Sequence, residues 1–192
     1  MEGAQRKRAV FLDRDGTINV EKEYLFRIEE FEFVPGAPEA IKLLKDAGFL
    51  VVVVTNQSGI GRGYYTEADL ERLHEFLSGE LAAIGTGVDA YYFCPHHPSH
   101  GTGKYRLECA CRKPLPGMLH AAAEDLQIDL AASYMVGDKL ADVVAGMAAG
   151  CRTILVRTGY GDAEADNVPA GTRVAGDLLA VARVILEESA EV

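Results

Sequence analysis

Residues 10–19 read VFLDRDGTIN, an apolar run that leads directly into two aspartates separated by one residue. The apolar part, together with Arg8 and Ala9, is predicted to form a short buried strand. Asp13 and Asp15 follow at its end, and because side chains alternate along an extended chain, both carboxylates can point to the same side. Two carboxylates this close repel each other, so the segment is either a solvated turn or the binding site of a positive group.

Strand-like and helix-like segments alternate along the rest of the chain. Segment 49–55 is apolar and β-branched with no polar face, which is typical of a central strand in a parallel sheet. Thr66 is expected to begin a helix, with Asp69 three residues later in a capping-box pattern. Further strands are expected at 89–93, 133–136, 152–156 and the start of 172–188, and further helices at 37–48, 116–127, 140–150 and the end of 172–188. This alternation predicts an α/β fold, a doubly wound, Rossmann-like parallel sheet with helices on both faces.

The composition fits a single domain over residues 1–192, because 48% of the residues are apolar and no repeat or linker is visible. The N-terminal segment lacks the apolar core of a signal peptide, and the longest apolar run is far shorter than a membrane span. We therefore expect a cytoplasmic monomer with no membrane partner. A net charge of −10 disfavours a nucleic-acid partner and leaves room for a local cationic pocket that binds a small anion.

Polar clusters recur where the predicted strands end. They are DRDGT at 13–17, TNQSG at 55–59, CRKP at 111–114 after a cysteine-rich segment, and GDKLAD at 137–142. In parallel α/β sheets ligands bind at the carboxyl ends of the strands, so the four clusters are expected to meet in one site. Their convergence argues against a simple solvated turn at Asp13 and Asp15.

Three carboxylates in these clusters predict a magnesium site. Asp138 follows the turn at Gly137 and can reach Asp13 and Asp15. Such a group repels itself unless a hard cation is present, and oxygen ligands together with a phosphate partner suit Mg²⁺. With the charge offset, one carboxylate can attack phosphorus, and the other can protonate the leaving oxygen and later activate water.

The remaining polar groups can hold a phosphoryl oxygen. Thr55 offers a hydroxyl, and side-chain and backbone groups beside it come from Asn56, Gln57 and Ser58. Lys113 can neutralise the phosphate and the nucleophile together, whereas Arg112 offers a planar fork for bidentate recognition.

Lys139 and Asp142 are ambiguous, because each could equally belong to a solvated surface. We expect Lys139 to contact the substrate. Asp142, one helical turn beyond Asp138, is expected to support the site rather than bind the metal.

The cysteine-rich segment predicts a second metal site. Cys94 and His96 are followed, after twelve residues, by Cys109 and Cys111. Three sulfurs and one imidazole match a closed, structural Zn²⁺ site that would fix loop 94–111. His97 and His100 compete with His96 as ligands, and the alternatives are buried free thiols or a zinc ribbon that binds a macromolecule. Cys151 precedes a strand and is expected to be core.

The motifs DRDGT, TNQSG, RKP and GDKLAD, in this order, resemble those of the haloacid dehalogenase superfamily over about residues 9–160. The resemblance implies that Asp13 is the nucleophile and forms an aspartyl-phosphate. It implies that Asp15 is the general acid and base, with its backbone carbonyl on the magnesium ion. Thr55 and Lys113 would stabilise the phosphoryl group, and Asp138 would be the third magnesium contact.

The zinc loop, and gaps between motifs too short for a large cap domain, resemble the small-cap branch of this superfamily. That branch holds phosphatases of D-glycero-D-manno-heptose 1,7-bisphosphate and of histidinol phosphate. The residues within the motifs, and the twelve-residue gap between His96 and Cys109, favour the heptose bisphosphate phosphatases. The implied reaction is magnesium-dependent removal of the C7 phosphate, in the supply of nucleotide-activated heptose for lipopolysaccharide or another surface glycan.

Segment 21–24 lies where this branch contacts the sugar, and its residues are Glu21, Lys22, Glu23 and Tyr24. Ser58 is expected to help there, and Arg112 is expected to grip the C1 phosphate. Other hypotheses are a histidinol-phosphate phosphatase, a non-enzymatic zinc-loop binding module, and a polynucleotide phosphatase, which the net charge disfavours. The intact set of aspartates and Lys113 argues against the binding module.

Overall fold

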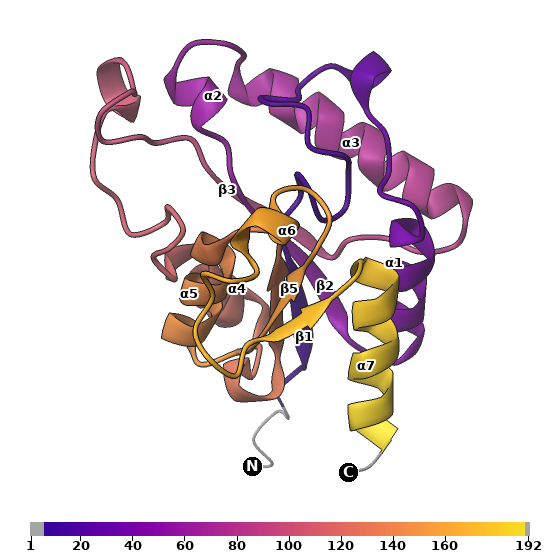
Figure 1. Ribbon diagram of the computed structural model, residues 1–192. Helices are drawn as coiled ribbons and strands as arrows, with labels where there is room; N and C mark the ends of the chain where they lie inside the picture. Colours follow the sequence, from indigo (N-terminus) through magenta and orange to yellow (C-terminus); the bar gives the residue numbers. More distant parts are fainter. Residues whose placement is uncertain (1–5, 191–192) are drawn as a thin grey trace, which may run out of the picture.

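The computed structural model describes residues 6–190. In that part of the chain, six strands form one sheet in the order β3-β2-β1-β4-β5-β6, and every neighbouring pair is parallel. The strands are β1 (Ala9–Leu12), β2 (Leu50–Asn56), β3 (Ala90–Cys94), β4 (Tyr134–Gly137), β5 (Arg152–Val156) and β6 (Arg173–Ala175). The predicted α/β fold with a doubly wound parallel sheet is confirmed (Figure 1).

Helices cover both faces of the sheet. The longer ones are α1 (Ala37–Asp46), α3 (Glu67–Ala83), α4 (Gly117–Leu126), α5 (Leu140–Ala149) and α7 (Leu178–Ala190). Helices α1 and α7 lie together on one face, and α4 and α5 lie on the other (Figure 1). The capping box predicted at Thr66 and Asp69 is present at the start of α3.

Several single-turn elements were not predicted. They are α2 (Ser58–Gly61), α6 (Gly161–Glu164) and the 3₁₀ turns η1 (Ile28–Glu30), η2 (Gly103–Tyr105) and η3 (Leu130–Ala132). One turn is too short to show an apolar period, so the sequence pattern cannot reveal it.

Strand β2 shows why segment 49–55 is apolar throughout. Val51 and Val53 enter the core beneath α1 and α7, whereas Val52 and Val54 enter the core beneath α4 and α5. Because side chains alternate along a strand, a strand covered on both faces needs an apolar residue at every position.

The sheet order brings the polar clusters together. Strand β1 lies between β2 and β4, with Leu12 opposite Val53 on one side and Val136 on the other. The chain runs outward from β1 through β2 and β3, and then returns to the opposite side of β1 at β4. This is the topological switch point at which α/β sheets bind ligands. The segments that follow β1, β2 and β4 therefore emerge side by side.

Two predictions concern the chain as a whole. No helix within residues 6–190 combines the length and the apolarity that crossing a bilayer requires. A single domain over residues 1–192 stays a prediction, and residues 1–5 and 191–192 lie outside the described residues.

Candidate active site

A cavity of about 440 Å³ lies at the switch point, a size in the range of small-molecule sites. Its lining includes most of the residues predicted from the sequence, namely Asp13, Asp15, Glu21, Glu23, Tyr24, Asn56, Gln57, Ser58, Arg112, Lys113 and Lys139. Tyr65, Ala141, Asp142 and Tyr160 also line it. Thr55 and Asp138 are buried beside these residues but are not part of the lining.

Lys113 is a buried cation that joins two of the carboxylates. Its Nζ lies 2.9 Å from Asp13 Oδ1 and 2.6 Å from Asp142 Oδ1, and it donates to the Val54 carbonyl at 2.7 Å. An ammonium has three protons, so these three partners satisfy it completely. Burial on its own would lower the pKa of Lys113, but the charges of Asp13 and Asp142 outweigh burial and raise it. Lys113 therefore stays charged inside the protein.

The backbone of Lys113 is fixed by Asn56, the last residue of β2. The Asn56 side-chain amide donates to the Lys113 carbonyl at 3.0 Å, and its oxygen accepts from the Lys113 N–H at 3.0 Å. These two hydrogen bonds join segments 57 residues apart and attach the CRKP cluster to the end of β2.

Asp13 is held in an environment with an excess of negative charge. Its Oδ1 accepts from the Arg14 N–H at 2.8 Å in addition to the Lys113 contact. Burial and the neighbouring carboxylate of Asp142 raise the pKa of Asp13 to about 6, although Lys113 acts in the opposite direction. A single buried cation does not compensate the carboxylates around it.

Asp138 provides the clearest indication of a cation site. Its Oδ2 accepts from the Tyr160 N–H at 2.9 Å, whereas its buried Oδ1 has no hydrogen-bond partner among the described residues. Burial and the charges of Asp13 and Asp142 raise the pKa of Asp138 to about 8. A buried oxygen is rarely left unpaired, so this orphan atom fits a ligand to a metal ion.

Glycines allow the backbone to approach Asp138 closely. A Cβ on Gly16, which has φ +81°, or on Gly159 would lie 2.2 Å from Asp138 Oδ2. Only glycine accommodates both this contact and the left-handed conformation at residue 16.

Oxygens of Asp13, Asp138 and Asp142 lie within 4.8 Å of one another, which is close enough for one metal ion. Asp142, however, already uses both oxygens. Oδ1 contacts Lys113, and Oδ2 accepts from the Lys139 N–H at 3.0 Å at the start of α5. These contacts agree with a supporting role for Asp142, and they leave Asp13 and Asp138 as the carboxylates with free ligand positions.

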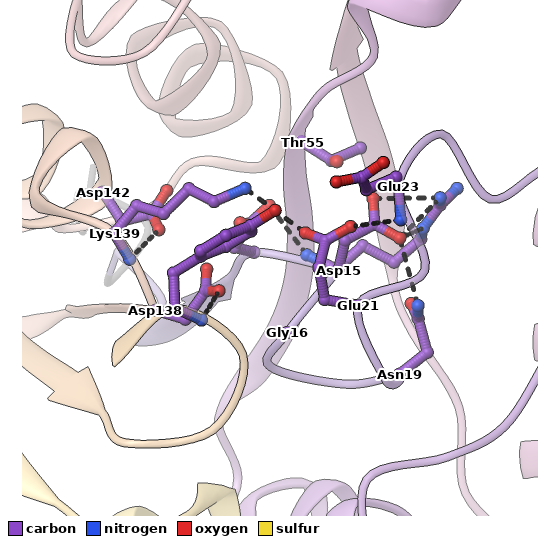
Figure 2. Close-up of polar contacts among 12 residues, drawn as sticks. Asp15, Gly16, Asn19, Glu21, Glu23, Thr55, Asp138, Lys139 and Asp142 are labelled. Atoms are coloured by element: carbon purple, nitrogen blue, oxygen red, sulfur yellow. Dashed lines mark hydrogen bonds and ion pairs between the residues drawn. The ribbon is translucent and has the colours of Figure 1, made fainter. Parts of the chain in front are cut away.

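Asp15 lines the same cavity as Asp13, but its oxygens have a different set of partners. Its Oδ1 accepts from Arg14 Nη2 at 2.9 Å and from Asn19 Nδ2 at 3.0 Å, and its Oδ2 accepts from Gln57 Nε2 at 3.0 Å. Burial alone would raise the pKa of Asp15, but Arg14, Asn19 and Gln57 together lower it below its usual range. Figure 2 shows Asp15 and Asn19 on one side of the site and Asp138 and Asp142 on the other.

Gln57 connects Asp15 with Thr55. Its Nε2 donates to Thr55 Oγ1 at 2.8 Å as well as to Asp15, and its Oε1 accepts from the Tyr65 hydroxyl at 2.5 Å. The Thr55 side chain is buried, and its hydroxyl proton is not used in the Gln57 contact. Its predicted role toward phosphate therefore stays a prediction.

The rim of the cavity carries an ion pair that the sequence did not reveal. Lys139 Nζ lies 3.3 Å from Glu21 Oε2 (Figure 2). It also lies 4.6 Å from the centre of the Tyr160 ring. The pKa of Lys139 is raised, because the charges of Asp138, Asp13 and Glu21 outweigh burial, which would lower it. Lys139 therefore lies at the rim of the cavity with a partly exposed side chain, and its predicted contact with the substrate stays a prediction.

One predicted substrate contact is placed elsewhere. Lys22 donates to the Glu30 carbonyl at 2.8 Å and lies 3.2 Å from Glu32 Oε2, so its side chain is directed away from the cavity. Glu23 and Tyr24, with φ values of 44° and 57°, turn the backbone in the left-handed region just after it. This turn keeps residues 21, 23 and 24 at the cavity while Lys22 faces the acidic segment at η1.

The four predicted zinc ligands also come together. Cys94 Sγ lies 2.9 Å from Cys111 Sγ and 3.5 Å from Cys109 Sγ, and His96 Nδ1 lies 3.4 Å from Cys111 Sγ. All four ligand atoms lie within 4.8 Å of one another, and this donor set fits a closed zinc site. Arg112 Nη1 donates to the His96 carbonyl at 3.2 Å, which attaches the loop to the cavity wall.

His97 and His100 are outside this cluster. Their rings pack together with centroids 4.6 Å apart, and His97 Nδ1 accepts from the backbone of Ser99 and His100. Cys151 is buried in the core beneath α4 and α5, as predicted, and burial raises the pKa of its thiol to about 12.

Arg14 and His74 are the main residues that the sequence did not single out. Arg14 is fully buried and contacts His74 on α3. The signal for Arg14 was its place between Asp13 and Asp15, where alternation directs a charged side chain toward a covered face. No comparable signal marked His74, which lies on the buried stripe of an ordinary amphipathic helix.

Comparison with known proteins agrees with this geometry. Residues 110–181 match the family model described as HAD-hydrolase-like. The D-glycero-β-D-manno-heptose-1,7-bisphosphate 7-phosphatase of Escherichia coli K12 is 54% identical over 152 residues, which cover 79% of this chain and 80% of that protein. The D-glycero-α-D-manno-heptose-1,7-bisphosphate 7-phosphatase of Burkholderia mallei is 50% identical over 151 residues, with the same coverage of 79% and 80%.

A solved structure shows the same architecture over nearly its full length. A D,D-heptose 1,7-bisphosphate phosphatase from B. bronchiseptica, complexed with magnesium and phosphate, superimposes with a TM-score of 0.85. It is 41% identical, and the match covers 94% of this chain and 99% of that one.

Proposed function

This chain belongs to the heptose-1,7-bisphosphate 7-phosphatase family of haloacid dehalogenase-like hydrolases, and we propose that it removes the C7 phosphate of D-glycero-D-manno-heptose 1,7-bisphosphate. The observation that carries the proposal is the buried group of Asp13, Lys113 and Asp138 beside a cavity with a second cation, Arg112. One part of the site suits phosphoryl transfer, and the arginine suits a phosphate that is retained.

In the proposed first step, a carboxylate oxygen of Asp13 attacks the phosphorus at C7, and the bond from phosphorus to the C7 oxygen breaks. Lys113 holds Asp13 in place through its 2.9 Å contact and carries positive charge toward the phosphoryl oxygens, with Thr55 as a further donor. The leaving oxygen belongs to a primary alcohol and takes a proton from Asp15, so this step requires Asp15 to be protonated when the phosphate is bound, although Arg14, Asn19 and Gln57 favour its ionised form against burial. The product of this step is an aspartyl-phosphate on Asp13.

In the second step, Asp15 acts as the base. Its ionised form, which the surrounding donors favour, accepts a proton from a water molecule as that water attacks the phosphorus. The bond from phosphorus to Asp13 breaks, inorganic phosphate leaves, and the Asp13 carboxylate is restored.

We infer that Asp13, Asp138 and the backbone carbonyl of Asp15 would hold a magnesium ion, which when bound supplies positive charge that offsets the carboxylates and polarises the phosphoryl group. The unpartnered Oδ1 of Asp138 supports this assignment, as does the raised pKa of both carboxyl groups. A structural relative was solved with magnesium and phosphate.

We further infer that Cys94, His96, Cys109 and Cys111 bind a structural zinc ion. Four protein ligands leave no open coordination position, so this ion would not take part in the chemistry. Its effect would be to hold Arg112 and Lys113, which directly follow Cys111, against the cavity.

For the retained C1 phosphate, Arg112 is the proposed contact, because its guanidinium fork suits phosphate and the metal loop fixes its backbone. The sugar would lie against Ser58 and the residues of segment 21–24 that face the cavity, with Lys139 at the rim. The relatives include enzymes named for the α and for the β anomer, so their names do not choose between the anomers.

We place this activity in the cytoplasm, on a monomer that acts on a small sugar bisphosphate for the synthesis of activated heptose. The net charge of −10 supports the absence of a nucleic-acid partner.

The test is phosphorus NMR of the heptose 1,7-bisphosphate reaction, with histidinol phosphate as a competing substrate. We expect the C7 resonance to disappear first, and histidinol phosphate to react far more slowly. Arg112→Ala should impair turnover of the bisphosphate much more than turnover of a simple monophosphate. Arg106→Ala, an exposed arginine of the same loop, is the matched control. Loss of the C1 resonance first would refute the regiochemistry, and equal rates on histidinol phosphate would refute the substrate.

A further inference from the structure

Arg14 is a charged side chain in a place where charge is costly. It is 0% exposed and is the largest of the fully buried side chains within residues 6–190. A guanidinium is tolerated in such a position only when its donors are paired. Arg14 is not among the residues that line the cavity, so it has no direct access to a substrate there.

Three of the five contacts of the Arg14 side chain are with Asp15. Nη2 lies 2.9 Å from Oδ1 and 3.0 Å from Oδ2, and Nε lies 3.3 Å from Oδ1. Asn19 and Gln57 supply one further donor each. Both oxygens of Asp15 are therefore fixed in direction, and Arg14 provides the largest share of the contacts.

The guanidinium is itself held by two distant segments. Nη2 donates to the Leu25 carbonyl at 3.0 Å, and Nη1 lies 3.4 Å from His74 Nε2. Because arginine can only donate, His74 Nε2 must accept, and the ring proton belongs on Nδ1. Burial and the charge of Arg14 lower the pKa of His74 to about 3, so the ring is neutral and can accept.

His74 has a fixed position of its own. Its ring stacks on Tyr91 of β3, with centroids 4.3 Å apart and planes at 17°, and the Tyr91 hydroxyl is 2.8 Å from Ser78 Oγ. Helix α3 and strand β3 therefore fix His74, His74 and Leu25 fix Arg14, and Arg14 fixes Asp15.

We propose that Arg14 is a positioning residue for the phosphatase reaction: held by His74 and the Leu25 carbonyl, its guanidinium sets the direction in which Asp15 presents its oxygens to the scissile bond. The inference rests on the proposed function, in which Asp15 protonates the leaving alcohol. The proposal makes the proton transfer from Asp15 depend on His74 and Arg14, neither of which lines the cavity.

The leaving group offers a selective test. An alkyl alcohol needs the Asp15 proton, whereas 4-nitrophenolate leaves without one, so misdirecting Asp15 should harm only alkyl esters. The constant kcat/KM covers the steps up to departure of the first leaving group, and so excludes the later hydrolysis of the aspartyl-phosphate. We therefore compare kcat/KM for heptose 1,7-bisphosphate and for 4-nitrophenyl phosphate, with saturating Mg²⁺.

Arg14→Gln removes the main group that lowers the pKa of Asp15, which would by itself leave more of Asp15 protonated. The loss of direction should outweigh this effect and lower kcat/KM on the heptose bisphosphate about 100-fold, and on the aryl ester by less than about threefold. His74→Phe keeps a ring against Tyr91 but removes the acceptor, and should lower only the alkyl value, about three- to tenfold. His74→Gln restores an acceptor and should recover most of that loss. Arg72→Gln, on an exposed face of the same helix, is the control and should change neither value.

Equal losses on both esters in Arg14→Gln and His74→Phe would show a merely structural role and overturn the inference. If Arg14→Gln does not fold, as judged from its thermal melting, the two His74 variants decide the question on their own. Wild-type protein that hydrolyses the aryl ester and other primary alkyl phosphates, but not the heptose bisphosphate, would overturn the proposed substrate alone. The ratio of kcat/KM on an alkyl ester to kcat/KM on 4-nitrophenyl phosphate is then measured with a primary alkyl phosphate that the protein does hydrolyse. Wild-type protein inactive on every ester would overturn both proposals.

Discussion

Asp13 and Asp15 belong to one motif and are two residues apart, yet the structure surrounds them with opposite charges. Around Asp13, the carboxylates of Asp138 and Asp142 outnumber the single ammonium of Lys113, and the pKa of Asp13 is raised to about 6. Around Asp15, every contact comes from a donor, and its pKa is lowered. The first environment needs a cation to be complete, whereas the second is already satisfied by the protein.

This difference separates two tasks. A carboxylate that lies beside other carboxylates has few donors around it, so its oxygens stay free to bind a metal ion or to attack phosphorus. This suits a nucleophile and metal ligand once a cation offsets the repulsion. A carboxylate with both oxygens directed by donors is oriented for proton transfer along a defined line, and its ionised form suits the role of a base. Of the four predictions below, those on Asp13, Asp15 and Asp138 test whether the two environments differ in function as they do in structure, and the one on the cysteine loop tests how the site is held in position.

The largest effect is expected for Asp13→Asn, which keeps the shape of the side chain but removes the attacking charge. We expect kcat to fall by at least about 10³-fold, as for the loss of a catalytic nucleophile, on alkyl and aryl esters alike. The measurement is phosphate release with Mg²⁺ present, with the thermal midpoint as the control for folding. A variant that kept most of its turnover would disprove the nucleophile assignment.

Asp15→Asn should distinguish the two environments directly. The amide cannot donate a proton to an alkoxide in the way a carboxylic acid does, so kcat/KM on the alkyl ester should fall about 10²–10⁴-fold. On 4-nitrophenyl phosphate, kcat/KM should fall much less than it does for Asp13→Asn. If the two variants had the same ratio of alkyl to aryl loss, the division of roles between Asp13 and Asp15 would be wrong.

The zinc loop, residues 94–111, should affect catalysis only by holding Arg112 and Lys113 in place. Purified protein should contain about one zinc ion per chain by elemental analysis, as a closed four-ligand site requires. Cys109→Ser should lose that metal and lower activity about 10–100-fold, because Arg112 and Lys113 are displaced. Cys151→Ser, outside the cluster, should keep the metal. Fully active native protein without zinc would contradict this prediction.

The smallest effect concerns stability in magnesium-free buffer that contains no chelator for zinc. The pKa of Asp138 is raised from 3.8 to about 8 in the folded protein, so the folded state binds this proton more tightly than the unfolded state. The corresponding stability is fully present below pH 4 and is lost as the pH rises toward 8. The Tm should therefore fall by several degrees between pH 5 and 8, since each kcal/mol corresponds to about 2–4 °C in a chain of this size.

Two comparisons check the origin of this pH dependence. Asp138→Asn should flatten the decline of Tm with pH, because the titrating group is gone. Added Mg²⁺ should raise the Tm of the native protein at pH 8 more than at pH 5, and should have little effect on the variant. A Tm that rose between pH 5 and 8 in magnesium-free native protein would contradict the charge excess around Asp13 and Asp138.

The fold was predictable from the sequence because its signals are local. A strand covered on both faces requires the apolar run at 49–55, and helix periodicity with a capping box marks α3. The missed elements, such as α2 and α6, are single turns, which are too short to show an apolar period.

The sequence by itself determined which chemical groups are available: the aspartates of two motifs, the lysine before Pro114, and three cysteines and one histidine at the spacing of a zinc site. These follow from residue identity and short-range spacing, which hold wherever the chain goes. The tertiary structure alone decided how each group is partnered. Lys22 is directed away from the cavity, and Arg14 reaches a histidine 60 residues away. A contact between distant segments exists only after the sheet and helices have packed, and a buried charge depends on its partners, so the contrast between Asp13 and Asp15 is a property of the folded protein.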